Sequence, residues 1–298
     1  MKRQILVAAC ILINYGVFAQ EEKSTVSRVE FNSISFSLGA ISSTEGFSNS
    51  INDFRKLAPN STILKQDFSE YDDNEFYSTV NTGPVFSLNT YFSIKNKKGE
   101  ESKYHPKFRI GISYSQQTLM SKNIYSSEIF RVDTLQSTAT GKTYYVDSID
   151  TENYFMEHSS EQLYIDGAFL ISSNPENRLM FYGGLGFSLG FSFNSQTFIT
   201  NNSDNYLESG ASINNNNNFN SPFGGDYKEE LFLNEEGFRA LVSVPIGVEL
   251  KFSNKDNAWN NCKVYVEGRP SISYATIERI GSNLSSTVIW GTGFKYDF

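Results

Sequence analysis

The stretch from Phe238 to Phe252, FRALVSVPIGVELKF, alternates apolar residues with residues of other kinds at a period of two. Every second residue is apolar, whereas the intervening residues include Arg239, Glu249 and Lys251. This period predicts a β-strand with one apolar face. A strand of about 15 residues is far longer than the five or six of a typical globular strand, and it suits a tilted strand that crosses a bilayer.

Seven other stretches have a strand-like composition, so we expect about eight strands. They are Phe31–Ile41, Gly83–Ile94, Lys107–Gln117, Tyr154–Ile171, Leu179–Thr200, Cys262–Ile277 and Thr287–Phe298. The first six connections alternate long and short, and the long ones are residues 42–82, 118–153 and 201–237. Short periplasmic turns and long outer loops are typical of membrane barrels. The sequence therefore predicts a closed antiparallel up-and-down transmembrane β-barrel.

The strand number of this prediction stays open. Alternating residues inside a long connection, such as Lys142–Ile149, could extend the strands above the membrane as a hairpin, which leaves eight or ten strands. The last predicted strand, TVIWGTGFKYDF, ends on the aromatic Phe298. In a closed barrel the last strand pairs with the first, so we expect Phe298 at the rim of the wall.

The N-terminus has the pattern of a targeting segment. Two basic residues precede a mostly apolar run, Ile5–Val17, and a small-x-small pattern follows at residues 17–19. We predict a signal peptide over residues 1–19 and an outer-membrane barrel domain over residues 20–298. A rival prediction is a lipoprotein signal at Cys10, although apolar residues continue beyond that cysteine.

Composition narrows the remaining classes. After residue 19 no run of 18 apolar residues occurs, so a membrane-spanning mature protein would have to be a barrel. The mature chain keeps one cysteine, Cys262, which excludes an internal disulfide and a cysteine-based metal site. The formal net charge of -8 argues against nucleic acid as a partner, because phosphates require clustered Lys and Arg.

Three glycine- and aromatic-rich strands carry a resemblance to a known family. They are GGLGFSLGF at Gly183–Phe191, VPIGVELKF at Val244–Phe252 and GTGFKYDF at Gly291–Phe298. With the signal peptide and the Asn- and Tyr-rich loops, they make residues 31–298 resemble the PorT-like outer-membrane β-barrel proteins of Bacteroidetes. The resemblance implies localisation in the cell outer membrane, contact with the assembly machinery that reads the last strand, and secretion-system components as partners. Outer-membrane lipid and lipopolysaccharide are the further partners that we expect.

A barrel of about eight strands has an interior that side chains just fill. The inward parity predicts a lumen charge cluster of Arg109, Asp166, Arg239, Glu249, Lys251, Lys263, Glu267 and Arg269. Because buried charges need partners, we expect a salt-bridged plug that closes the lumen. The alternative is a selective path for small solutes.

Aromatic residues near strand ends predict the two membrane interfaces. The predicted interface aromatics are Tyr91, Trp259, Trp290, Tyr296 and Phe298, with Phe92, Tyr114, Phe181, Tyr182 and Phe252 as further members.

Candidates for catalysis and metal binding are weak. His158 lies in the polar run EHSSE, but a catalytic triad converges from separate elements, so we expect no catalytic residues and no enzyme. Asp72, Asp73 and Glu75 lack the glycine and spacing of an EF-hand, and we expect no metal and no cofactor.

The expected role is structural, as an interaction platform, or as an accessory to secretion or transport. The alternative is a secreted or surface-attached β-sandwich binding module, such as an adhesin or lectin. A sandwich would bury one core between two sheets, whereas a membrane barrel has an apolar outer face and a polar interior.

Overall fold

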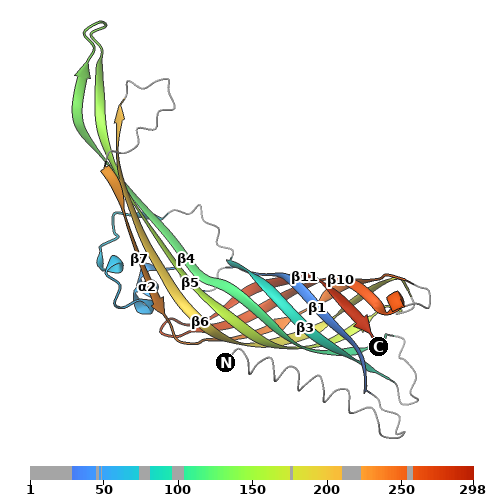
Figure 1. The fold of residues 1–298 in the computed structure, drawn as a ribbon. Helices are drawn as coiled ribbons and strands as arrows, with labels where there is room; N and C mark the ends of the chain where they lie inside the picture. The colour runs from blue at the N-terminus through green and yellow to red at the C-terminus, as the bar shows by residue number, and fades with distance from the viewer. Residues whose placement is uncertain are drawn as a thin grey trace.

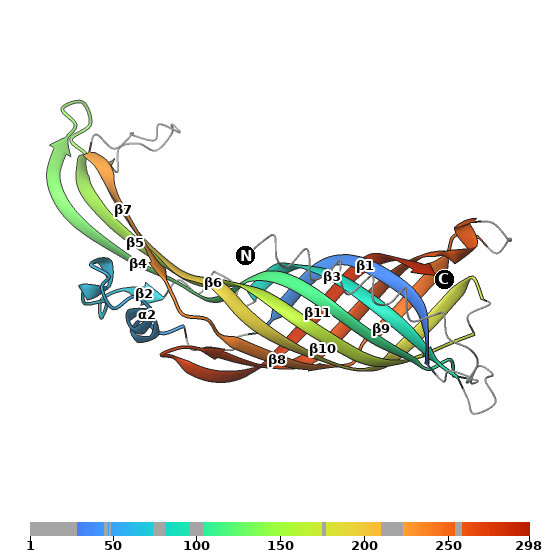
Figure 2. The ribbon, with the colours of Figure 1, turned by 60° about the horizontal axis from the view of Figure 1, so that its bottom comes forward.

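Antiparallel strands wind into one closed ring in the computed structural model (Figures 1 and 2). The structure describes residues 29–44, 47, 49–73, 81–95, 104–174, 177–209, 223–253 and 258–298. The predicted signal peptide, Cys10, Glu75 and the Asn tract at residues 214–218 lie outside these ranges. No helix in the described ranges is long and apolar enough to cross a membrane.

Eight positions make up the ring. In ring order they are β1 (Val29–Ser43), β3 (Asn81–Ile94), β4 (Lys107–Gln136), β5 (Thr143–Ser172), β6 (Leu179–Ser209), the pair β8 (Phe238–Ser243) and β9 (Ile246–Lys251), β10 (Cys262–Ile277) and β11 (Gly281–Asp297). β11 returns to β1 in a register that runs from Ser43 opposite Thr287 to Ser33 opposite Asp297. The predicted eight-strand closed barrel is therefore confirmed, and the β-sandwich alternative is wrong.

The last strand lies where the sequence places it. β11 pairs with β10 on one side and with β1 on the other. The backbone N–H of Phe298 donates to the carbonyl of Asn32 at 2.9 Å. The ring of Phe298 packs against Phe31 with 5.0 Å between ring centroids, so the closing seam ends in an aromatic contact.

The sixth predicted strand is not continuous. It divides into β8 and β9 at Val244 and Pro245, although both parts pair with β6 and β10. Pro245 has no N–H to donate to the ladder, so the pairing breaks there. Two backbone bonds bridge the break: Val244 N–H donates to Pro270 and Gly184 N–H donates to Pro245, each at 3.0 Å.

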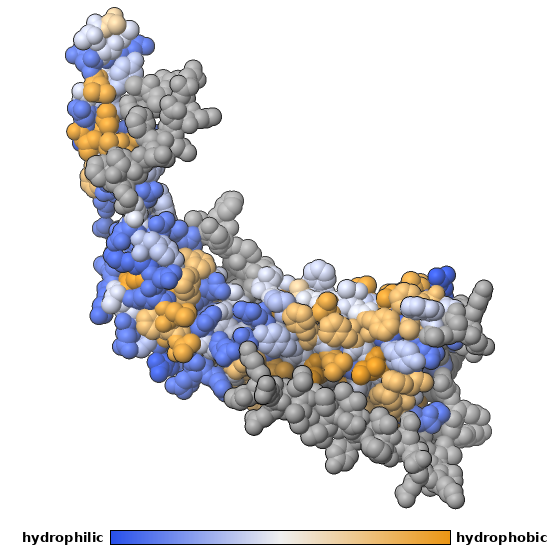
Figure 3. Space-filling model, in the orientation of Figure 1, coloured by the Kyte–Doolittle hydropathy of each residue, from blue (hydrophilic) through white to orange (hydrophobic). Residues whose placement is uncertain are grey.

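Side chains alternate around the ring between an apolar exterior and a polar interior. The apolar band is the set of outward residues on the ring, and it includes Phe36, Ile112, Ile165, Leu185, Phe187, Val242, Val266 and Trp290, each at least 43% exposed. On β5 this band ends above Leu163, because Glu161, Ser159 and Glu157 continue the outward face. Figure 3 shows apolar residues gathered along the barrel and polar residues around its outer end. An apolar exterior around a polar interior is the arrangement of an outer-membrane β-barrel.

Two of the three long connections are largely strand, not loop. β4 and β5 continue to Gln136 and Thr143, so residues 118–153 form a long hairpin. β6 continues to Ser209, and its residues Gln196–Asn205 pair with β7 (Phe223–Leu233). We call the part of β4, β5, β6 and β7 above the apolar band the arm (Figure 1). The extra strand therefore lies in the arm and adds nothing to the ring count.

In the first long connection, the described residues 49–73 form a cap. It contains β2 (Asp72–Asp73), which pairs with β4, the helix α2 (Ile51–Leu57) and the 3-10 turn η1 (Ile63–Lys65). Ser50 caps α2, accepting from the backbone N–H of Asp53 at 3.2 Å and donating to its carboxylate at 2.7 Å. The cap lies at the outer end of the barrel beside the base of the arm (Figure 2). A second 3-10 turn, η2 (Ala258–Asn261), joins β9 to β10 at the other end.

Candidate functional site in the barrel lumen

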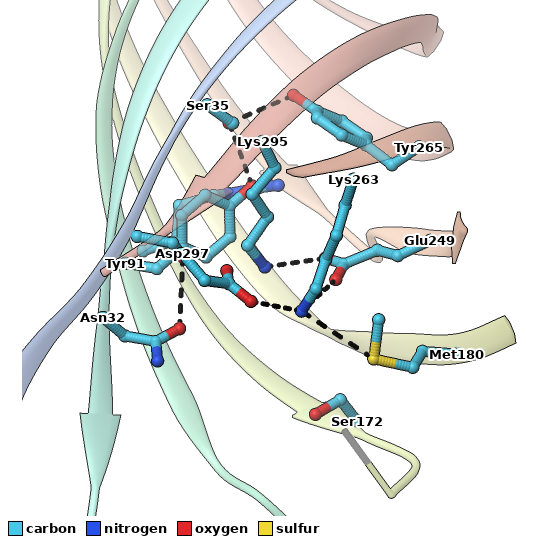
Figure 4. Close-up of polar contacts among 12 residues, drawn as sticks. Asn32, Ser35, Tyr91, Ser172, Met180, Glu249, Lys263, Tyr265, Lys295 and Asp297 are labelled. Atoms are coloured by element: carbon cyan, nitrogen blue, oxygen red, sulfur yellow. Dashed lines mark hydrogen bonds and ion pairs between the residues drawn. The ribbon is translucent and has the colours of Figure 1, made fainter. Parts of the chain in front are cut away.

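The inner layer of the lumen is a buried cluster of charges at the periplasmic end (Figure 4). Lys295 Nζ donates to Glu249 at 2.8 Å, and Lys263 Nζ lies 3.8 Å from the same carboxylate. Lys263 also pairs with Asp297. Both lysines are only 1% exposed, and the ammonium of Lys295 lies 4.2 Å from the centroid of the Tyr91 ring. Paired charges and a cation–π contact together satisfy groups that water cannot reach.

The middle layer is a second ion-pair network. Glu267 lies between two guanidinium groups: Arg109 donates to it at 2.6 Å, and Arg269 pairs with its other oxygen. Asp166 accepts hydrogen bonds from Ser113 and Ser188. All three members of the ion triad are at least 93% buried, so each depends on the other two for compensation.

The outer layer holds a cation among neutral oxygens. Arg239 is 2% exposed and donates to Ser273 at 3.2 Å, to Thr287 at 3.1 Å and to the side-chain oxygen of Gln117. Glycines make room for the large rings of the interior. A Cβ at Gly190 would lie 2.5 Å from the Tyr164 ring, and one at Gly247 would lie 2.3 Å from the Tyr182 ring.

Above the apolar band, a polar chain connects the wall to the cap. His158 Nδ1 lies 3.0 Å from Thr197 Oγ1, which donates to Asn234 Oδ1 at 2.7 Å. Asn234 then donates to the carbonyl of Leu57 in α2 at 2.8 Å. Burial is the main cause that lowers the pKa of His158 to about 4, against hydrogen bonds of the imidazole to Asn234 and to the backbone of Gln196 that raise it. The imidazole is therefore neutral at pH 7.

The cap closes the outer end with an apolar core. Phe54, Leu57 and Leu64 of the cap pack with Met120, Met156 and Ile199 of the wall in one buried cluster. Glu230 of β7 clasps the cap, accepting from the backbone N–H of Thr62 at 2.9 Å and from the hydroxyls of Ser61 and Thr62. Burial raises the pKa of Glu230, but the hydrogen bonds from Ser61 and Thr62 outweigh it and lower that pKa overall.

The predicted lumen charge cluster lies largely together. Seven of its eight residues, Arg109, Asp166, Arg239, Glu249, Lys263, Glu267 and Arg269, are buried in the interior. Lys251 is only half-buried, opposite Lys263 at the rim. The sequence reasoning left out Lys107, Lys295 and Asp297. Their signal was present, since Lys107 shares the parity of Arg109, and Lys295 shares that of Gly291 and Gly293.

The predicted interface aromatics divide into two groups. Trp259, Trp290 and Phe298 are 61%, 59% and 71% exposed, and Tyr296 packs on Phe298 at 5.1 Å. Tyr91 and Tyr182 do not lie at the interface, because they are 1% and 7% exposed inside the lumen. Tyr91 lies directly opposite Arg109, and paired residues share a face. Both tyrosines were misplaced because position near a strand end does not reveal the face.

The weaker candidates remain isolated. His158 is 1% exposed, and the described contact of its Nδ1 is with Thr197 rather than with a serine. Asp72 and Asp73 form the short strand β2. Within the described ranges, no three His, Cys, Asp or Glu side chains gather closely enough to hold a metal ion.

A scan against models of protein families found no match, and no curated protein sequence matches the chain. Among solved structures, Neisserial surface protein A (NspA) is 9% identical with a TM-score of 0.28, covering 93% of this chain and 100% of its own. Ail, the attachment invasion locus protein of Yersinia pestis, is 10% identical with a TM-score of 0.25, covering 89% and 99%. The translocator domain of the autotransporter NalP from Neisseria meningitidis is 10% identical with a TM-score of 0.17, covering 99% and 98%. These values are too low to support an argument about function.

Proposed function

We propose that the chain is an integral outer-membrane protein whose sealed barrel anchors the arm outside the cell, and that the arm binds a macromolecular partner. The observation that carries this proposal is the continuity of β4, β5 and β6, which run unbroken from the ring into the arm. Outer-membrane lipid and lipopolysaccharide would surround the apolar band, and the outer-membrane assembly machinery would insert it. We propose no catalytic role.

The filled interior supports an anchor in preference to a channel. Three polar layers cross the lumen, and the cap core lies above them. A cavity beside Glu267 and Arg269 has a volume of about 10 Å³, which is the space of one water molecule at most. A conducting path would have to displace both the ion pairs and the cap.

Compared with the ring, the arm offers the larger surface to which a partner could bind. From Thr118 to Gln136, β4 alone spans roughly 60 Å at about 3.3 Å per residue. Its exposed apolar side chains include Ile129 and Val132 on β4, Tyr145 on β5 and Leu231 and Leu233 on β7, all at least 46% exposed. In the described part of the chain, the edge of β4 that faces away from β5 has no strand partner above Tyr125, and the edge of β7 that faces away from β6 has none either. Open edges and exposed apolar groups favour association with another polypeptide.

The secretion role implied by the PorT-like resemblance is a finer proposal within the same frame. A secretion component would be the partner of the arm or of the periplasmic end. The PorT-like resemblance is the support for secretion in preference to another surface role.

Site-specific photo-crosslinking tests the proposal. A photoreactive residue at Ile129 of the arm should give a discrete protein adduct in whole cells, whereas one at Phe187 in the apolar band should give lipid adducts. Purified protein in liposomes should not increase their permeability to small sugars. Protein adducts missing from the arm, or sugar uptake by the liposomes, would contradict the proposal.

A further inference from the structure

The lumen carries an excess of positive charge, although the chain has a formal net charge of -8. Six inward cations lie within the apolar band: Lys107, Arg109, Arg239, Lys263, Arg269 and Lys295. Four inward carboxylates accompany them: Asp166, Glu249, Glu267 and Asp297. The excess is two positive charges, and Lys251 at the rim adds another cation. A low-dielectric interior makes such an imbalance costly.

Lys107 is the unmatched cation at the inner end. It is 8% exposed, it points inward at the start of β4, and it forms no hydrogen bond or ion pair with the described residues. Its charge interacts with Lys295 and Lys263, which repel it, and with Glu249 and Asp297. Those two carboxylates already contact Lys295 and Lys263. The third ammonium of the cluster therefore has no anion of its own.

One acceptor in the same cluster is also unmatched. Oδ2 of Asp297 pairs with Lys263, whereas Oδ1 is buried with no hydrogen-bond partner. A ligand that fits both groups needs an anionic oxygen for Lys107 and a donor for Asp297. The Asp297 side chain is 22% exposed, so solvent reaches the cluster from the periplasmic end.

We propose that the inner mouth of the barrel binds a small oxyanion that also carries a hydrogen-bond donor, with Lys107 as its principal charge partner. Monohydrogen phosphate has both features. An ammonium is a compact point charge that binds phosphate without demanding a fixed geometry. The oxyanion would complete the cluster by neutralising the cation that the protein leaves unpaired. The ligand could be a free periplasmic anion or the phosphoryl group of a lipid, and the two sources are separable by experiment.

Calorimetric titration of the folded protein with sodium phosphate in nonionic detergent, at constant ionic strength set by chloride, tests the site. The wild-type chain should bind phosphate saturably. Lys107→Met should weaken binding at least tenfold, and Lys107→Arg should retain most of it. Lys142→Met, which removes the same charge from the exposed turn of the arm hairpin, should leave binding unchanged. The heat-dependent shift on an unboiled gel verifies that every variant is folded.

A second set of measurements separates the two sources of the anion and tests whether Lys107 has only a structural role. If phosphate fails to bind in detergent, the unfolding midpoint should be higher in phosphatidylglycerol vesicles than in phosphatidylcholine vesicles, and Lys107→Met should abolish that difference. This result assigns a net-anionic lipid headgroup with hydroxyl donors, because phosphatidylcholine carries the same phosphoryl group beside a cation and has no hydroxyl donor. Without anion, Lys107→Met should raise the midpoint, because it removes the positive charge that Lys295 and Lys263 repel. The proposal would be overturned if neither set of measurements showed a response to the anion, or if wild type and Lys107→Met responded equally.

Discussion

The strands β4, β5 and β6 each build two regions that obey different rules. Within the ring, outward residues are apolar and inward residues are polar, as for Ile165 and Asp166 on β5. Beyond its contacts with the cap, the arm loses this alternation: the neighbours Ile129 and Phe130 are 65% and 49% exposed on opposite faces. A strand keeps a strict period of two only where its two faces meet different surroundings. The outer part of the arm, beyond the cap, has water on both faces, so nothing enforces the period there.

The two regions also differ in how they satisfy their edges and charges. The ring has no open edge, because β11 pairs with β1. The arm ends in the open edges of β4 and β7. Most charges in the ring lie in buried ion pairs, whereas those of the arm are largely exposed, as in the Lys228–Asp226 pair with both side chains over 60% exposed. The same type of interaction should therefore have different energetic weight in the two regions.

Removing the central carboxylate of the ring should produce the largest effect. Glu267→Gln leaves Arg109 and Arg269 buried without a counter-charge, which should cost about 3–5 kcal/mol in the free energy of unfolding. Urea unfolding in lipid vesicles measures it. The control Asp226→Asn breaks the exposed arm pair and should cost under about 1 kcal/mol. Equal costs for the two variants would refute the contrast between the regions.

A matched pair of arginine substitutions tests where along the molecule the membrane ends. Leu185 in the apolar band is 66% exposed and Leu233 on β7 is 83% exposed. Leu185→Arg should destabilise the folded barrel in vesicles by about 2–4 kcal/mol, because the charge enters hydrocarbon. Leu233→Arg should change stability by less than about 0.5 kcal/mol, because that position meets water. A tolerated Leu185→Arg would place the band outside the membrane.

The buried imidazole above the band predicts a pH dependence. The pKa of His158 is about 4 in the folded chain against about 6.5 unfolded, so the unfolded state takes up the proton first. The stability from this residue is complete above pH 6.5 and is lost as the pH falls toward 4, by roughly 2–3 kcal/mol. In His158→Gln, the urea unfolding midpoint, measured at successive pH values, should depend much less on pH across this window. A midpoint in wild type that is constant from pH 7 to 4 would contradict this.

The clasp between Glu230 and the cap should give the smallest effect. The lowered pKa of Glu230 means that its stabilisation is present above the ordinary glutamate range and is lost as the pH falls below about 4. Cap opening, measured by amide exchange of α2, should increase on acidification in the wild type. In the Glu230→Gln variant, amide exchange of α2 should already be faster at neutral pH. It should no longer depend on pH in this range. Glu229→Gln, one residue away on the exposed face, is the control and should behave like the wild type.

Much of the ring was predictable because its alternation follows from the two solvents of a membrane barrel. The inward face of β8 and β9, with Arg239 and Glu249, was read correctly from parity alone. The ends of the strands were not predicted correctly, since β4 continues to Gln136 whereas the sequence suggested an end at Gln117. Above the membrane the period fades, so no pattern distinguishes a long strand from a loop.

The sequence by itself determined the alternation of most strands, their number as eight or ten, and the charged character of the lumen, because these depend on a local period of two. Only the tertiary structure decided which charges meet. Arg109 and Glu267 are 158 residues apart, and their contact depends on the register of the strands between them. The tertiary structure also decided that Tyr91 faces inward and that residues 49–73 fold over the barrel mouth. Register and loop docking are long-range properties, and a one-residue slip would turn every side chain of a strand to the other face.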